Sequence, residues 1–236
     1  MKIRSKIYIH PLYYLVAFIS FFIGRFKLFI IYTIIILVHE LGHIFAGIIL
    51  KWPIDKVIVY PFGCMTKFNN KLNSSIYEEF LILVYGPLFQ ILFNMLYKTP
   101  YHNFILLFNL LPIYPLDGSK LLFLVLNKLV SYYYSYIIIY VISFITIFII
   151  IVTNHDLISV LIFSYIIYDL IRYINCLNSI MFKFYYERYK MDIKYNKIKI
   201  INGNKLKKIY KERINYFKIG DKYYSECIIL RKTFDK

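Results

Sequence analysis

The sequence predicts an all-α, polytopic membrane protein with about six membrane-spanning helices. Hydrophobic residues make up 60% of its 236 residues, and the mean hydropathy is +0.58, which is more than one soluble core requires. The apolar residues also gather into runs near the length of about 20 residues that a spanning helix needs. In chain order these runs cover residues 7–24, 28–50, 77–97, 104–126, 132–153 and 157–174.

The first run is predicted to be a retained helix. It has a basic start, but no small-residue cleavage site of a signal peptide follows it. With six spans and a cytoplasmic N-terminus, most Lys and Arg residues outside the spans fall on the cytoplasmic side, as the positive-inside rule requires. We therefore expect a multi-pass protein of the cell membrane with both termini in the cytoplasm.

The second run contains the sequence His39-Glu40-Leu41-Gly42-His43. On a helix, residues four apart project from one face, so His39 and His43 can bind the same ion. Glu40 is offset by about 100° around the helix, where its carboxylate can reach a water molecule beside the metal. This spacing is typical of zinc hydrolases, with Zn²⁺ held by the histidines and Glu40 as the general base.

The alternative interpretation is that neighbouring helices satisfy these three side chains without a metal. Hydrocarbon surroundings weaken that alternative, because ionisable groups within a span cost several kcal/mol unless they are paired, metal-bound or beside a wet cavity. A catalytic zinc usually takes a third protein ligand and leaves its fourth position to water. A further ligand is therefore expected elsewhere in the chain.

The loop between the second and third runs is predicted to form a small β-hairpin at the membrane surface. Residues 56–60 are a short β-branched run, followed by Pro-Phe-Gly and a second run, 65–68. Interfacial packing is one role for such a hairpin. The other is pairing with an unwound peptide segment by strand addition, in which Val59 and Phe62 would contact the substrate.

The fourth run is broken by Pro112, Pro115 and Gly118, and Asp117 lies within the break. A broken helix at membrane depth is tolerated only inside protein or beside a cavity. Proline also removes backbone donors, so this segment is predicted to bend around a polar pocket with Asp117 facing inward. Asp117 could instead be a helix cap beside a turn-forming glycine.

Residues 176–236 differ from the rest of the chain: they hold 16 of the 29 Lys and Arg against 6 acidic residues, a net charge of +10. We assign residues 1–175 to a membrane domain and residues 176–236 to a short basic cytoplasmic tail. The tail is expected to contact acidic lipid head groups or to have a regulatory role. The positive charge alone would permit nucleic-acid binding, but the sequence contains no recognition motif. We therefore expect no nucleic-acid partner.

The two motifs together, His-Glu-Leu-Gly-His and Asn109-Leu-Leu-Pro-Ile-Tyr-Pro-Leu-Asp117-Gly, resemble the site-2 protease family of intramembrane zinc metalloproteases. The resemblance covers the family's three-helix catalytic core, at about residues 28–126, and includes Gly86-Pro87 between the motifs. It implies that His39, His43 and Asp117 bind Zn²⁺, that Glu40 is the catalytic acid and base, and that Asn109 helps to hold substrate.

The short chain with cytoplasmic termini is similar to the sporulation branch of that family. This resemblance implies cleavage of a membrane-associated protein, such as a sigma-factor precursor during sporulation, in or near a transmembrane segment. A membrane inhibitor or regulator protein and the lipid bilayer are the other expected partners. A hypothesis of another class is a zinc-binding transporter or an inactive regulatory homologue, which would use the same ligands without proteolysis.

Overall fold

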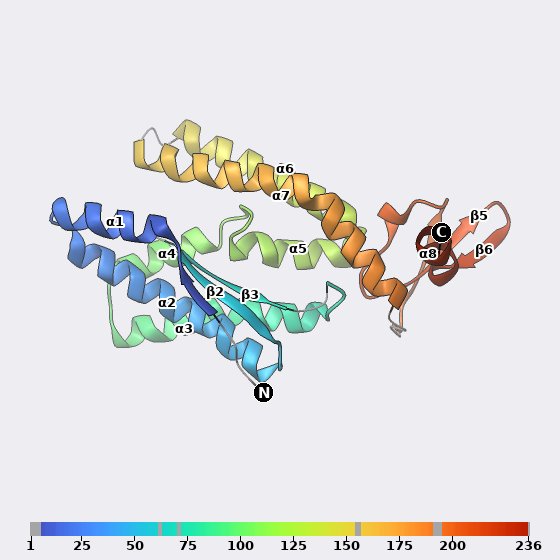
Figure 1. Cartoon of the computed structure of the whole chain (residues 1–236), viewed down its shortest axis with the longest axis horizontal. Helices are drawn as coiled ribbons and strands as arrows, with labels where there is room; N and C mark the ends of the chain where they lie inside the picture. Colours follow the sequence, from blue (N-terminus) through green and yellow to red (C-terminus); the bar gives the residue numbers. More distant parts are fainter. Residues whose placement is uncertain (1–5, 61–62, 70–71, 154–156, 191–194, 236) are drawn as a thin grey trace. The chain divides into compact units, whose positions relative to one another are not determined.

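The computed structural model describes residues 6–60, 63–69, 72–153, 157–190 and 195–235 (Figure 1). The chain is mostly helical and divides into two compact units, which are described separately. The first unit is formed by Met1–Asn70 and Tyr77–Asn109, and the second by Lys71–Ile76 and Leu110–Lys236. The elements of the first unit are β1 (Lys6–Ile9), α1 (Pro11–Phe22), α2 (Phe26–Ile49), β2 (Ile54–Tyr60), β3 (Gly63–Phe68), α3 (Ile76–Leu96) and α4 (Tyr101–Asn109).

The first apolar run is not one spanning helix. It begins as β1, and α1 has 12 residues, about 18 Å of helix, whereas a bilayer core is about 30 Å thick. The change occurs at His10, whose Nδ1 accepts the Leu12 N–H at 3.3 Å, with Pro11 at the start of the helix. Residues before it extend because they pair with β2, a tertiary interaction that outweighs their apolar helical pattern.

The predicted hairpin is confirmed, and it belongs to a larger sheet. β2 and β3 are antiparallel, with Val57 opposite Thr66, and β1 pairs in parallel with the other edge of β2. Both edges of β2 are therefore paired, and β3 is an outer strand that packs on α2 (Figure 1).

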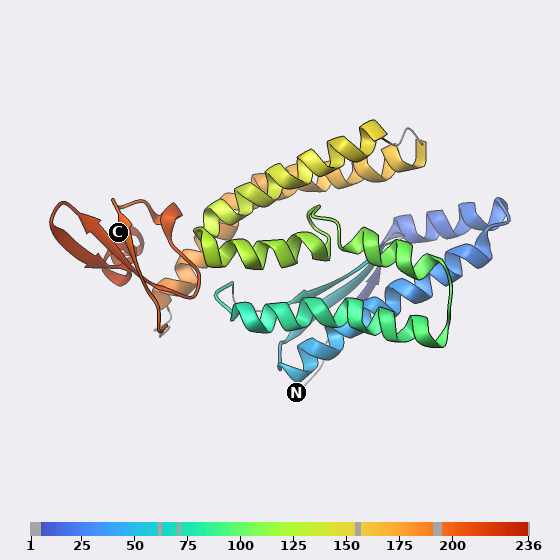
Figure 2. The ribbon, with the colours of Figure 1, turned by 180° about the vertical axis from the view of Figure 1, so that it is seen from behind.

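Helices α2 and α3 lie beside each other (Figure 2), and glycine residues permit their close approach. A Cβ atom at Gly42 of α2 would overlap the backbone of Tyr85 and would lie 2.9 Å from the Cα of Gly86 in α3. Small residues at such crossings let two membrane helices pack backbone to backbone. This crossing brings α3 against the face of α2 that carries both histidines.

Among the described residues, three helices are long and apolar enough to cross a membrane: α2, α3 and, in the second unit, α6 (Tyr132–Thr153). The predicted break in the fourth run is confirmed, since α4 ends at Asn109 and α5 (Asp117–Leu129) begins after a non-helical segment. The sixth run lies within α7 (Leu157–Lys190), which continues well past residue 174. Helices α6 and α7 lie side by side in both views (Figures 1 and 2).

The end of the second unit contains a small sheet of order β4-β5-β6, in which β4 and β5 are parallel and β5 and β6 antiparallel. Its core includes Phe217 and Leu230, and the side chain of Arg188 at the end of α7 forms a buried ion pair with Glu226. Its elements are β4 (Ile198–Asn202), η1 (Leu206–Lys208), β5 (Ile214–Ile219), β6 (Lys222–Ser225) and α8 (Glu226–Phe234).

Candidate metal centre

His39 and His43 lie on one face of α2, one helical turn apart, and both are buried. Their Nε2 atoms are 3.1 Å apart, so the two imidazoles converge on one point, as the four-residue spacing predicts. The rings meet edge to face, with an interplanar angle of 77°. Two nitrogens at this separation are in reach of a single metal ion, because zinc–imidazole bonds are about 2.0–2.1 Å long.

The other ring nitrogen of each histidine contacts an oxygen atom of the protein. His43 Nδ1 is 2.7 Å from the carbonyl oxygen of Ile82, and His39 Nδ1 is 2.9 Å from Oε1 of Gln90. A carbonyl oxygen only accepts hydrogen bonds, so each Nδ1 carries the proton. In the neutral imidazoles, both Nε2 atoms then present lone pairs.

A cation beside the two Nε2 atoms, which are 3.1 Å apart, would accept a lone pair from each ring. Donors of this type and orientation are those that bind zinc, with the outer nitrogens anchored by a second layer of hydrogen bonds. The residues present therefore fit a metal ion.

Gly86 leaves the space into which the two imidazoles project. A Cβ atom at this position of α3 would lie 2.9 Å from Nε2 of His39 and would overlap the ring of His43. Any larger residue would displace the rings. Glycine is thus required here, because only a residue without a Cβ lets α3 approach the two imidazoles this closely. This requirement gives the glycine of the Gly86-Pro87 pair a steric role.

Glu40 follows His39 in α2 and is buried, with 6% of its surface exposed. Its Oε1 accepts the backbone N–H of Thr66 in β3 at 2.6 Å. This N–H is directed at α2 instead of at the neighbouring strand, so the carboxylate lies beside the outer edge of β3. Burial, together with the Glu40 charge, raises the pKa of the nearby Cys64 thiol to about 12, which keeps that cysteine protonated.

Asp117 is the first residue of α5 and is 7% exposed. Leu116 holds the N-cap position, so Asp117 does not cap the helix, and its Oδ1 accepts a hydrogen bond from Lys120 Nζ at 2.9 Å. An aspartate carboxylate of this kind is a usual zinc ligand beside histidines.

The segment between α4 and α5 is supported by hydrogen bonds that replace the interrupted helix. Ser143 of α6 accepts the Tyr114 N–H at 2.9 Å and donates to the Pro112 carbonyl at 3.3 Å. A Cβ at Gly118 would lie 2.6 Å from the Leu111 carbonyl oxygen, so only glycine permits this fold-back. The freed backbone groups are thus satisfied within protein, as a break of this kind requires.

The residues predicted to contact substrate are placed as follows. Asn109 ends α4 and is half-buried. Val59 lies in β2, where its carbonyl accepts the His10 N–H at 2.9 Å and Cys64 of β3 is its cross-strand partner. Since both edges of β2 are paired, Val59 offers no free backbone for strand addition. Phe62 lies outside the described residues.

Three contributors to this centre were not among the predicted residues: Gln90, the backbone carbonyl of Ile82 and the backbone N–H of Thr66. The two backbone groups leave no trace in the sequence. Gln90 does leave one, because an amide in the middle of an otherwise apolar span requires a partner.

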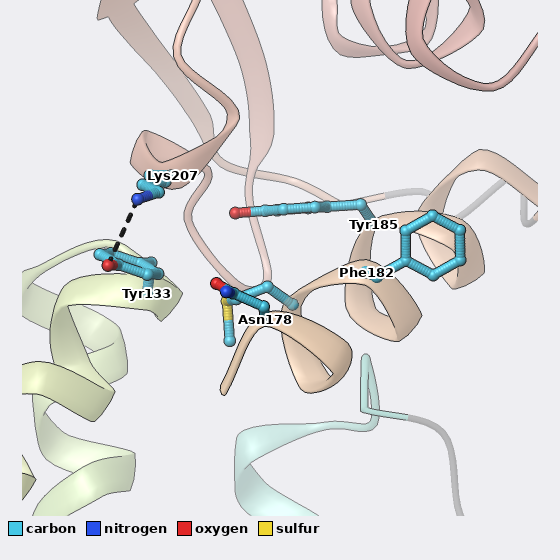
Figure 3. A pocket seen from close by; sticks show the side chains of 6 residues that line it. Tyr133, Asn178, Phe182, Tyr185 and Lys207 are labelled. Atoms are coloured by element: carbon cyan, nitrogen blue, oxygen red, sulfur yellow. Dashed lines mark hydrogen bonds between the residues drawn. The ribbon is translucent and has the colours of Figure 1, made fainter. Parts of the chain in front are cut away.

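A pocket in the second unit has no features of a metal centre (Figure 3). Lys207 donates to the Tyr133 hydroxyl at 3.4 Å across it. Its lining residues include no imidazole, thiol or carboxylate, so they offer no usual zinc ligand. They are Tyr133, Asn178, Met181, Phe182, Tyr185 and Lys207.

Comparison with known proteins gives two informative matches, although no protein-family model matches the chain. Over 139 residues, 52% of this chain, the sequence is 35% identical to Stage IV sporulation protein FB of Bacillus subtilis (strain 168). The match covers 48% of that relative, so the chain spans about half the length of the curated protein it matches.

The fold is similar to that of the site-2 protease from Methanocaldococcus jannaschii, with a TM-score of 0.57 and 22% sequence identity. The similarity covers 73% of this chain and 92% of that one. Together the two matches confirm the resemblance to the site-2 protease family and its sporulation branch.

Proposed function

We propose that this chain is an intramembrane zinc metalloprotease that hydrolyses a peptide bond in or near a transmembrane segment of a membrane-associated protein. The observation that carries the proposal is the pair of buried imidazoles whose Nε2 atoms converge to 3.1 Å, adjacent to a buried carboxylate. In this proposal His39, His43 and Asp117 bind the ion. The similarity to site-2 protease family members supports it.

Bound zinc supplies Lewis acidity, which polarises a scissile carbonyl and makes water more acidic. Glu40 serves as the general base and returns the proton to the leaving amine. Its neighbours suit this role, because the Thr66 N–H fixes one carboxylate oxygen at 2.6 Å and leaves the second oxygen for a water molecule. The backbone of β3 therefore orients the base.

The outer edge of β3 is the proposed docking position for an unwound substrate segment. This edge is adjacent to Glu40, as the hydrogen bond from Thr66 indicates, whereas both edges of β2 are paired. A strand added there would bring its peptide groups beside the catalytic carboxylate. A strand added at this edge has to compete with Glu40 for the Thr66 N–H. Asn109 and the side chains of Val59 and Phe62 are further proposed contacts with the substrate.

The expected partners follow from the same proposal. A sporulation role, with a sigma-factor precursor as the substrate, is supported by the similarity to a sporulation protein. A membrane inhibitor or regulator is a second proposed partner, and the lipid bilayer surrounds the spanning helices. The excess of Lys and Arg in the predicted cytoplasmic segments supports a cytoplasmic location for both termini.

The direct test is cleavage of a membrane-tethered reporter precursor by the purified full chain, with bound zinc measured in the same samples. Glu40→Gln should retain zinc and lose cleavage by at least about 100-fold, since general acid–base catalysis contributes 10²–10⁴ in rate. Asp221→Asn is the matched control, because it removes an exposed carboxylate at the turn between β5 and β6. It should cleave at the wild-type rate.

The same experiment separates the transport or regulatory alternative. If the wild type and Glu40→Gln both bind zinc and neither cleaves a membrane substrate, the three zinc ligands have a role in metal binding without proteolysis. If Glu40→Gln cleaves as fast as the wild type, the proposed base is wrong.

A further inference from the structure

Gln90 lies in the middle of α3 and is 1% exposed. Its amide is used at both ends: Oε1 is 2.9 Å from His39 Nδ1, and Nε2 donates to the backbone carbonyl of His102 at 2.8 Å. A buried amide in an apolar helix is costly unless both ends are paired. Here the two partners are a histidine at the candidate metal centre and the first turn of α4.

The contact with His102 determines how the amide is oriented. Oxygen and nitrogen of a glutamine side chain are exchangeable in principle, and only the hydrogen-bond network assigns them. The His102 carbonyl can only accept, so it takes the NH₂ group, and Oε1 must then face His39. His39 therefore donates from Nδ1, which leaves its Nε2 lone pair directed at His43.

The two histidines differ in how this tautomer is maintained. His43 is held by the main-chain carbonyl of Ile82, which no side-chain substitution removes. At His39 the acceptor beside Nδ1 is a side chain, the amide of Gln90, which a substitution can remove. The three positions of α3 that contact the imidazoles, Ile82, Gly86 and Gln90, are spaced four residues apart and so lie along one face of the helix.

We propose that Gln90 is a positioning residue that fixes the tautomer and ring orientation of His39 and thereby sets how tightly the centre holds its metal. The inference rests on the proposed metal site and adds a residue that the two motifs do not contain. Outer hydrogen bonds to a metal-binding histidine typically change metal affinity by 10–100-fold when they are removed. The effect of losing Gln90 should fall in that range.

The test uses the full chain purified in detergent, with the zinc dissociation constant measured by competition with a chromophoric chelator. Gln90→Met has a similar volume and no hydrogen bonds, and it should weaken zinc binding by about 10–100-fold. Gln90→Glu keeps an acceptor for His39 and should bind within about threefold of the wild type or more tightly. The control is Asn94→Leu, which removes a half-buried amide one turn along α3 and should leave affinity unchanged.

Two additional measurements do not depend on activity. Cobalt substituted into Gln90→Met should show an altered visible absorption spectrum, because the His39 ring is no longer held in one orientation. In the metal-free wild type labelled with [¹⁵N]histidine, the His39 ring should carry its proton on Nδ1. This second measurement needs no variant, so it remains decisive if Gln90→Met does not fold.

Wild-type zinc affinity in a folded Gln90→Met protein would overturn the inference, and so would a proton on Nε2 of His39 in the wild type. Failure of the proposed function has a different signature, because the wild type itself would then bind no zinc or cleave no substrate. A wild type that binds zinc and cleaves, beside a Gln90→Met variant of equal affinity, refutes only the role of Gln90.

Discussion

Replacing Gly86 by alanine should abolish tight metal binding while leaving the helices folded. The new Cβ would lie 2.9 Å from His39 Nε2 and overlap the ring of His43. Ordinary contact between such atoms begins near 3.5 Å, so Nε2 must retreat by about 0.6 Å, and His43 by more. Metal–ligand distances tolerate only about ±0.2 Å, so we expect zinc affinity to fall by at least about 100-fold.

Fold stability should change little in this variant. The atoms that meet the new methyl group are side-chain atoms of two rings, which can rotate. Alanine is also favoured over glycine inside a helix by about 1 kcal/mol, which offsets part of the strain. The thermal midpoint of the metal-free protein should therefore remain within a few degrees of the wild-type value.

Gly42→Ala is the informative partner of this variant. The Cβ at Gly42 meets the backbone of Tyr85, which cannot rotate away, so α2 and α3 must separate. Overpacking of this kind costs up to about 3 kcal/mol, which exceeds the gain of about 1 kcal/mol from alanine in a helix, so a net loss should appear in thermal stability. The assay is zinc competition and thermal denaturation on both variants. Wild-type zinc affinity in Gly86→Ala would refute the argument, as would unaltered stability in Gly42→Ala.

Three other outcomes test separate parts of the chain. Iodoacetamide at pH 8 should modify Cys64, whose pKa is raised to about 12, at least roughly tenfold more slowly than exposed Cys227, and the Cys64 rate should still be rising above pH 10. Equal rates, read by mass spectrometry, would contradict this. Ser143→Ala leaves the Tyr114 N–H without its acceptor and should lower the free energy of unfolding by about 1–3 kcal/mol in denaturant titrations. Glu226→Gln removes the charge paired with buried Arg188 and should cost about 3–5 kcal/mol, seen as faster proteolysis of β4–α8; an unchanged digestion rate would exclude a structural role for the pair.

The elements that the sequence predicted well are those with a strong local signal. The spacing of His39 and His43 requires only helical geometry, and the structure brings their Nε2 atoms to 3.1 Å. The prolines and glycine around Asp117 predicted a broken helix because each removes a backbone donor or a Cβ. The β-branched run of β2, followed by Pro-Phe-Gly, predicted a hairpin for the same local reason.

The features that escaped prediction depend on distant partners. Lys6–Ile9 continues into an apolar run, and only its pairing with β2 makes it a strand. The same is true of Gln90, whose role becomes visible only through the His102 carbonyl and His39. Hydropathy also predicts that α1 belongs to a membrane span, because it measures only apolar character. It does not detect the change at His10 and Pro11 that shortens the helix.

The regular spacing along α3 restricts which insertions and deletions this protein can tolerate. Ile82, Gly86 and Gln90 contact the two imidazoles at intervals of four residues. One residue inserted between Ile82 and Gly86 would rotate the rest of the helix by about 100°, so the anchor of His43 and the anchor of His39 could no longer face α2 together. Length changes in the loop between α3 and α4, residues 97–100, would leave that register intact. Insertions and deletions at the ends of α3 therefore preserve this centre. Within the nine residues 82–90 they would disrupt it.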